Sequence, residues 1–106
     1  MVKILEKDIQ KAICDYLAFK QYFFWRQNTA PSFDKSQGAY RAMPKYSKNG
    51  VPDIILIKEG KFIGLEVKQP KGKQSDNQII FEKECTQAGG EYHIVTSIDD
   101  VIALRL

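Results

Sequence analysis

Apolar residues near the start of the chain recur at the three- and four-residue spacing of a helix with one buried face. The stripe comprises Leu5, Ile9, Ala12, Ile13, Tyr16 and Leu17. The run 22–26 that follows is aromatic and short, which predicts a strand. Residues 28–50 are rich in Asn, Pro, Ser and Gly and predict a loop, in which 40–43 is a candidate brief strand.

Two apolar runs, 53–58 and 61–68, flank Glu59-Gly60 and predict a β-hairpin. Both of its faces are largely apolar, which predicts a central pair of strands covered by helices on both sides. Ser75, with Gln78 three residues later, matches a capping box, and the helix that follows is expected to end at Gly89-Gly90. That helix carries the apolar residues Ile79, Phe81, Cys85 and Ala88.

Alternating residues at 92–96 predict a further strand, and Ser97 is expected to cap a short last helix. The order of elements is therefore helix, three strands, helix, strand, helix. With 106 residues and no linker or internal repeat, the chain is expected to form a single mixed α/β domain over residues 1–106.

Composition places the chain among soluble globular proteins, since 43% of its residues are hydrophobic and 27% are charged. No apolar run is long enough for a membrane span, and the charged N-terminus does not resemble a signal peptide. We therefore expect a cytoplasmic protein without membrane contact, in a bacterium or a virus-infected cell. Cys14 and Cys85 are expected to be small buried thiols in a reducing compartment.

Charge is unevenly distributed along the chain. Residues 20–52 hold six basic residues and one acidic residue, whereas the chain as a whole has a net charge of +3. This distribution indicates a polyanion-binding surface, although a solvated lysine-rich loop explains the charge equally well. The sequence contains no phosphate-binding loop, dinucleotide fingerprint or zinc-ligand spacing, so no nucleotide cofactor is expected.

The register of the hairpin is the most informative prediction. If Lys58 faces Lys61, then Asp53 lies opposite Glu66, with Cβ atoms about 4.5–5.5 Å apart. Two carboxylates at that distance on an apolar surface repel each other, and a divalent cation compensates them. Lys68 projects from the same face, and Gly64 is expected to leave space there.

Two acids and a lysine on one face suit the metal-assisted hydrolysis of a phosphodiester. Taken alone, Asp53 is more often a turn or capping residue, and Glu66-Val67-Lys68 more often marks an exposed strand. Helical phase also turns Glu6 toward the core stripe and gives Gln78 the direction of Cys85, which makes both candidates for the edge of the site. A frayed helix end explains Glu6 equally well, and the capping box explains Gln78.

Gly50-Val51-Pro52-Asp53 and Gly64-Leu65-Glu66-Val67-Lys68 together resemble the signature of PD-(D/E)xK nucleases. With Glu6, Gln78 and Gly89-Gly90, the chain resembles the stand-alone type of the VRR-NUC (virus-type replication-repair nuclease) family. This resemblance covers nearly the whole chain. It implies a restriction-endonuclease-like αβββαβ core, in which helices flank a mixed central sheet.

The resemblance also implies roles for individual residues. Asp53 and Glu66 would be metal-binding carboxylates, the main-chain carbonyl of Val67 a further ligand, and Lys68 the catalytic lysine. Glu6 would support the metal or its waters, and Gln78 would position the lysine or the substrate. Members of the family use Mg²⁺ or Mn²⁺ and cut DNA, and stand-alone members resemble viral or bacterial proteins that dimerise and resolve four-way junctions.

These observations lead to the hypothesis of a metal-dependent DNA endonuclease that cuts structured or branched DNA, such as a four-way (Holliday) junction, as a homodimer. The alternatives are a non-catalytic nucleic-acid-binding module of the same fold and a flap or single-strand nuclease. Contacts to the DNA backbone are expected from Lys35, Arg41, Lys45, Lys48, Lys71 and Lys73. Trp25 and Tyr40 are candidates for stacking on unpaired bases, with core packing as the alternative for Trp25.

Overall fold

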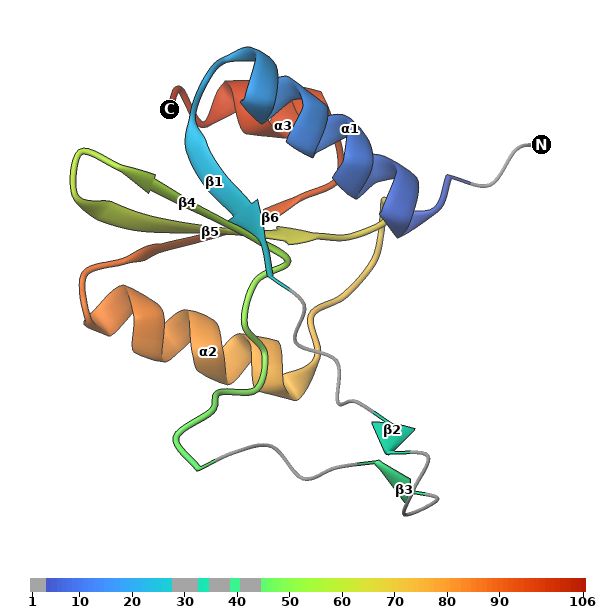
Figure 1. Ribbon diagram of the computed structural model, residues 1–106, viewed down its shortest axis with the longest axis vertical. Helices are drawn as coiled ribbons and strands as arrows, with labels where there is room; N and C mark the ends of the chain where they lie inside the picture. The colour runs from blue at the N-terminus through green and yellow to red at the C-terminus, as the bar shows by residue number, and fades with distance from the viewer. Residues whose placement is uncertain (1–3, 28–32, 35–38, 41–44) are drawn as a thin grey trace.

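A four-stranded mixed sheet forms the centre of the protein in the computed structural model, which describes residues 4–27, 33–34, 39–40 and 45–106 (Figure 1). Its strands lie in the order β1 (Phe23–Arg26), β4 (Ile54–Lys58), β5 (Lys61–Val67) and β6 (Glu91–Val95). Strand β4 is antiparallel to both β1 and β5, whereas β6 runs parallel to β5. The predicted hairpin, β4 with β5, is therefore the central pair of the sheet.

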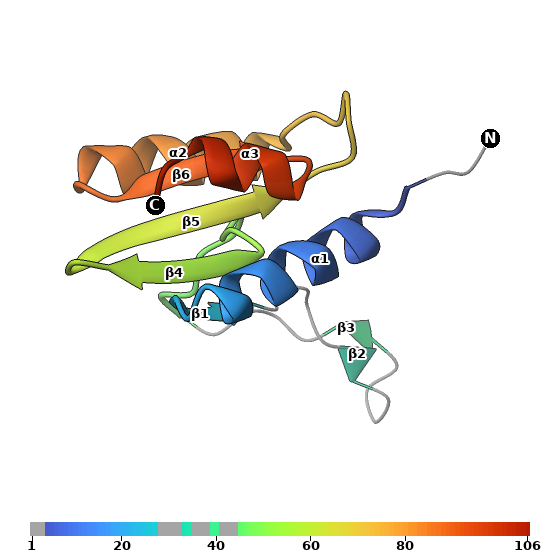
Figure 2. The same ribbon diagram turned by 90° about the horizontal axis from the view of Figure 1, so that it is seen from above.

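Helices cover both faces of this sheet, as the apolar hairpin predicts (Figures 1 and 2). Helices α1 (Glu6–Phe19) and α3 (Ile98–Ala103) lie together on one face, and α2 (Asp76–Gln87) lies on the other. The mixed α/β class and the predicted order of elements are confirmed. A separate two-stranded sheet joins β2 (Phe33–Asp34) to β3 (Ala39–Tyr40), so the predicted brief strand includes Tyr40 while residues 41–43 lie outside the described residues.

The hydrophobic core lies between the sheet and the pair α1 and α3. Its main contributors from the helices are Ile9, Ile13, Leu17 and Val101. Its main contributors from the strands are Ile54, Leu56, Ile63, Leu65, Val67 and Val95. The predicted stripe of α1 is thus buried from Ile9 onward, but Leu5 is 39% exposed because it caps the helix at an end that extends past the core.

Helix α2 begins and ends where the sequence predicts, since Ser75 and Gln78 form both hydrogen bonds of a capping box. No residue of α2 is fully buried. Ile79 is half exposed, Ala88 is exposed, and Phe81 and Cys85 are half-buried. Among the described residues, the main contacts of the helix with the sheet are with β6.

Cys14 and Cys85 are free thiols, and both are half-buried rather than fully buried. Burial raises the pKa of each thiol, which keeps the sulfur protonated. Within the described residues, no helix is long and apolar enough to cross a membrane.

Candidate metal-binding and catalytic site

The register of the central hairpin is the predicted one and brings Asp53 and Glu66 together. Lys58 pairs with Lys61 and Ile54 pairs with Leu65. Strand β4 begins at Ile54, so Asp53 lies one residue before the strand. Its main-chain carbonyl oxygen accepts a hydrogen bond of 2.8 Å from the N–H of Gln27, which continues the pairing of β1 with β4.

Pro52 and Gly64 fix the position of the segment that carries Asp53. A Cβ atom on Gly64 would lie 2.4 Å from Cγ of Pro52, far inside van der Waals contact. The expectation that Gly64 leaves open space at the site is therefore wrong, because the ring of the buried Pro52 fills that space. The glycine permits the loop before β4 to pack directly on β5, and this contact holds the aspartate next to the end of β5.

Asp53 and Glu66 meet at the end of β5. An oxygen of the Asp53 carboxylate, Oδ2, accepts a hydrogen bond of 2.8 Å from the N–H of Val67. Glu66 is the single buried charged residue among those that the structure describes, with 3% of its surface exposed. The two carboxyl groups therefore face each other across the hairpin, one of them withdrawn from water.

The electrostatics of Glu66 follow from this burial. The pKa of its carboxyl is raised from 4.5 to about 8, first by burial and then by the hydrogen bond and the negative charge of Asp53. Lys68 and the hydroxyl of Tyr92 act in the opposite direction. Burial and the charge of the second carboxylate both disfavour the ionised form of this carboxyl. A divalent cation bound to the two groups would offset both effects. The two carboxyl groups are also the hard oxygen donors that Mg²⁺ and Mn²⁺ prefer.

Lys68 joins the two acids, as the alternation along the strand predicts. Its Nζ atom lies 4.0 Å from Oε2 of Glu66, and only 14% of its side chain is exposed. The main-chain N–H of Lys68 donates a hydrogen bond of 3.0 Å to the carbonyl oxygen of Val95, so the residue is tied to β6. The site thus combines two carboxyl groups with a shielded ammonium group.

Tyr92 is a member of this cluster that the sequence did not predict. It is 6% exposed, and its hydroxyl donates a hydrogen bond of 3.4 Å to Oε1 of Glu66. Burial, followed by the charge of Glu66, raises the pKa of the Tyr92 hydroxyl, which keeps it a donor. Its ring packs against Phe81 of α2 with centroids 5.9 Å apart. The alternation of β6 identified the strand, but the parallel register that places Tyr92 beside Glu66 is not readable from the sequence.

Tyr92→Phe is expected to lower the free energy of unfolding by about 1 kcal/mol, because the buried Glu66 carboxyl loses a hydrogen-bond partner. Urea unfolding at neutral pH would measure the change. Tyr46→Phe is the matched control, since Tyr46 is 87% exposed and should show no effect. Equal stabilities of the Tyr92 variant and the wild type would show that the hydroxyl does not support Glu66.

Glu6 does not join this cluster. It lies in the first turn of α1 and is exposed, so the expectation that it points into the core is wrong. The reason is that the whole turn extends beyond the sheet, as the exposure of Ile4 and Leu5 also shows. Within the described residues, no three Asp, Glu, His or Cys side chains come together as a metal site. A role for Glu6 near the metal stays a prediction.

Gln78 is held by the capping box. Its Oε1 accepts a hydrogen bond of 2.9 Å from the N–H of Ser75, and its own N–H donates to Oγ of Ser75 at 3.2 Å. Gly50 packs on the backbone of Asn77 and Gln78, since a Cβ atom on this glycine would lie 2.3 Å from the carbonyl oxygen of Asn77. A role for Gln78 in positioning Lys68 or a substrate stays a prediction, as does the Val67 carbonyl as a ligand.

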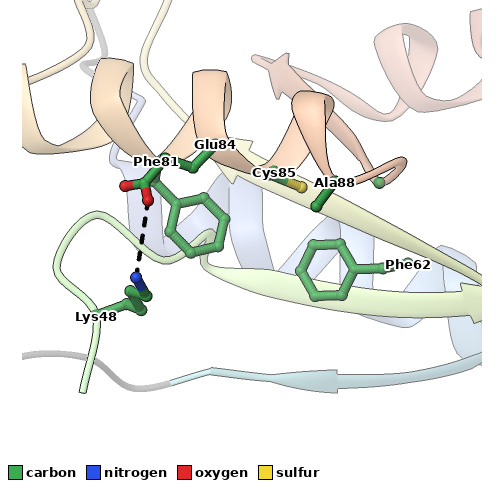
Figure 3. Close-up of a pocket in the computed structure, with 7 residues that line it drawn as sticks. Lys48, Phe62, Phe81, Glu84, Cys85 and Ala88 are labelled. Carbon is green, nitrogen blue, oxygen red and sulfur yellow. Dashed lines mark ion pairs between the residues drawn. The ribbon is translucent and has the colours of Figure 1, made fainter. Parts of the chain in front are cut away.

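Most of the cations expected to contact DNA are on the surface. Lys45, Lys48, Lys71 and Lys73 are exposed, whereas Lys35 and Arg41 lie outside the described residues. Lys48 makes a long ion pair of 3.8 Å with Glu84 of α2 (Figure 3), which is weak because both side chains are mostly exposed. Lys71 belongs to the turn that directly follows Lys68, and Lys73 follows that turn.

The same ion pair lies at a cavity of about 410 Å³ between α2 and β5 (Figure 3). Most of its lining is apolar, with Phe62 from the strand and Phe81, Cys85 and Ala88 from the helix. Phe62 and Glu66 are four residues apart on one strand, so the cavity and the acidic cluster lie on the same face of the sheet. The face of the sheet on which α2 lies thus carries both an apolar hollow and the polar site.

Comparison with known proteins supports the fold that the motifs imply. No family model and no curated protein matches the sequence. A solved structure described as a VRR_NUC domain is similar with a TM-score of 0.66 and 19% sequence identity, over 94% of this chain and 92% of that one. The chain therefore has the fold of a VRR_NUC domain.

Proposed function

We propose that this protein is a divalent-metal-dependent DNA endonuclease whose active centre consists of Asp53, Glu66 and Lys68. The observation that carries the proposal is the buried Glu66 carboxyl, 3% exposed, beside Asp53 and with the Lys68 ammonium group 4.0 Å away. A purely structural role for this cluster would leave a costly buried acid unexplained. The fold of a VRR_NUC domain supports a nuclease, since the solved relative carries that description.

Asp53 and Glu66 would hold an Mg²⁺ or Mn²⁺ ion, with the main-chain carbonyl of Val67 and the carboxylate of Glu6 as further candidates. The chemistry that such a cation supplies is polarisation of the scissile phosphate and a lower pKa of the attacking water. Lys68 orients that water and offsets the negative charge that develops on the phosphate. The hydrogen bond from Val67 to Asp53 and the hydroxyl of Tyr92 keep the two carboxyl groups in place.

The proposed substrate is structured or branched DNA, including four-way junctions. The cations that approach its phosphates are Lys35, Arg41, Lys45, Lys48, Lys71 and Lys73. A symmetric homodimer would present two active centres to two strands of a junction, and we propose this assembly for junction resolution.

A cleavage assay tests the proposal. A labelled four-way junction and a matched linear duplex would be incubated with Mg²⁺, Mn²⁺ or chelator, using the wild type and Asp53→Asn. Cleavage of the junction alone, dependent on both metal and Asp53, is the expected result. Equal cleavage of both substrates would keep the nuclease and discard the preference for junctions. Binding without cleavage under any condition would make the protein a non-catalytic DNA-binding module.

The double substitution Lys45→Glu and Lys48→Glu is expected to weaken DNA binding in a salt-dependent way. Each lysine that neutralises a phosphate adds about 1 to the slope of log affinity against log salt, so the slope should fall by about 2. Fluorescence anisotropy with a labelled duplex at several salt concentrations would measure it. The control is Lys7→Glu with Lys11→Glu on the exposed face of α1, which changes the net charge equally. Equal slopes in both double variants would place the DNA elsewhere.

A further inference from the structure

Strand β1 exposes two aromatic rings at the edge of the sheet. Phe23 is 69% exposed and Trp25 is 40% exposed. Their rings pack edge to face with centroids 5.9 Å apart. We name these two residues the aromatic edge. Large rings left in water on an edge strand are unusual in a small domain and mark a contact surface.

The aromatic edge lies on the same face of the sheet as the acidic cluster. Trp25 pairs with Ile55, and Phe23 pairs with Ile57. Residues two apart on a strand share a face, so Trp25 lies on the side of β4 that carries Asp53. Ile55 in turn pairs with Gly64 of β5, whose side of the strand also carries Glu66. This is the face of the sheet on which α2 lies, mainly against β6.

Hydrogen bonds fix the position of Trp25 relative to the active centre. Its indole Nε1 donates to Oε1 of Gln27 at 2.9 Å, and the N–H of Gln27 donates to the carbonyl oxygen of Asp53. Strand geometry separates the Cα atoms of Trp25 and Asp53 by about 5 Å across the strands and by about 7 Å along them. Successive nucleotides of a stacked strand rise by about 3.4 Å, so the indole lies within two or three nucleotides of the acids.

The charge of the chain segments next to the aromatic edge indicates the kind of partner. The described segments 20–27 and 45–52, which hold β1 and the loop before Asp53, contain basic residues and no acidic residue. These basic residues are Lys20, Arg26, Lys45 and Lys48, and all four are exposed. Arg26 alternates with Trp25 and lies on the other face of β1, and Lys48 pairs with Glu84, so these cations flank the aromatic edge along the chain. Exposed aromatic rings beside basic segments suit single-stranded nucleic acid, because the rings stack on bases while the cations attract phosphates. An apolar protein contact would not require this excess of positive charge.

We propose that Phe23 and Trp25 form a stacking site for unpaired bases of the DNA strand that lies in the active centre. The enzyme would thereby select DNA with a single-stranded segment next to the cleavage position, as at a junction, flap or gap. The inference rests on the proposed function for its location, but base stacking is measurable without cleavage.

Trp25 is the only tryptophan of the chain, so its intrinsic fluorescence reports directly on this site. The protein, in chelator to prevent cleavage, would be titrated with a short oligothymidylate and with an abasic strand of equal length. The two strands carry the same phosphates, but only the first carries bases. Quenching by the oligothymidylate alone is the expected result.

Variants separate stacking from general binding. Trp25→Ala is expected to weaken binding of the oligothymidylate by about 5- to 150-fold, as measured by anisotropy, and Trp25→Phe should retain most of the affinity. Phe19→Ala is the matched control, since Phe19 is 83% exposed at the end of α1 and should leave binding unchanged. Circular dichroism would confirm that each variant is folded.

Equal quenching by the two strands, or unchanged affinity in Trp25→Ala, would overturn the inference. A change from dimer to monomer in Trp25→Ala with unchanged DNA affinity would also overturn it and assign the aromatic edge to a contact between copies of the chain. A different result would refute the proposed function. Base-dependent quenching without any cleavage by the wild type would refute the nuclease and leave the stacking site in place.

Discussion

Lys68→Ala is expected to slow DNA cleavage by roughly 10²–10⁴-fold while leaving metal affinity largely intact. The Lys68 ammonium group is mostly shielded from water and lies 4.0 Å from Oε2 of Glu66, where it can orient a water and offset charge on the phosphate. It carries no oxygen donor, so the carboxyl groups that would hold the metal remain. Single-turnover cleavage of the preferred substrate would measure the rate, and calorimetry would measure the affinity for Mn²⁺.

The metal titration needs a pH above 8, because Lys68 lowers the pKa of Glu66 and its loss would let protons compete with the metal at lower pH. Lys71→Ala is the matched control, since Lys71 lies in the adjacent turn but is exposed. It should weaken DNA binding slightly and leave the rate at saturating DNA unchanged. A large loss of Mn²⁺ affinity at high pH in Lys68→Ala would make the lysine a structural residue of the metal site.

The free energy of unfolding of the metal-free protein is expected to fall as the pH rises from about 5 to 8. The pKa of Glu66 is near 4.5 in an unfolded chain and about 8 in the folded protein. Between these values the folded state holds a proton that the unfolded chain releases, so a higher pH favours unfolding. The stabilisation is fully present below pH 4.5 and is lost as the pH passes 8, with a loss on the order of several kcal/mol.

Glu66→Gln isolates this contribution. Glutamine keeps the size of the side chain and has no proton to release, so its unfolding free energy should change much less over the same pH range. Urea unfolding of both proteins at several pH values in chelator would measure the difference. Parallel pH profiles of the two proteins would contradict a raised pKa at Glu66. Added Mg²⁺ should stabilise the wild type more at pH 8 than at pH 5, because the cation competes with the proton for the carboxyl oxygens.

The sequence predicted the central hairpin and the cluster on it because both depend on local rules. A tight turn at Glu59-Gly60 sets the register, and the register places Asp53, Glu66 and Lys68 on one face. The capping box at Ser75 is local as well, and its hydrogen bonds form as expected. Each of these features requires only residues that are close in the chain or joined by one turn.

Features that depend on distant packing were missed. Tyr92 reaches Glu66 through the parallel pairing of β5 with β6, and no tight turn joins these two strands. The helical phase of α1 correctly predicts that Ile9 and Ile13 are buried. It does not show where the core ends, so it wrongly predicts that Glu6 points into the core. The prediction of open space beside Gly64 is wrong because Pro52, from a different segment, fills that space, and the sequence does not show this contact.

Helix α2 has no buried residue, and this has a consequence for local unfolding. Its packing contributes little free energy, so its amide hydrogens should exchange with solvent through a small local opening, while those of α1 and the central strands require nearly global unfolding. Phe81 of α2 packs on Tyr92, and the hydroxyl of Tyr92 donates a hydrogen bond to Glu66. An opening of α2 would therefore admit water to the buried acid, and the lifetime of this helix would set how long Glu66 stays shielded from solvent.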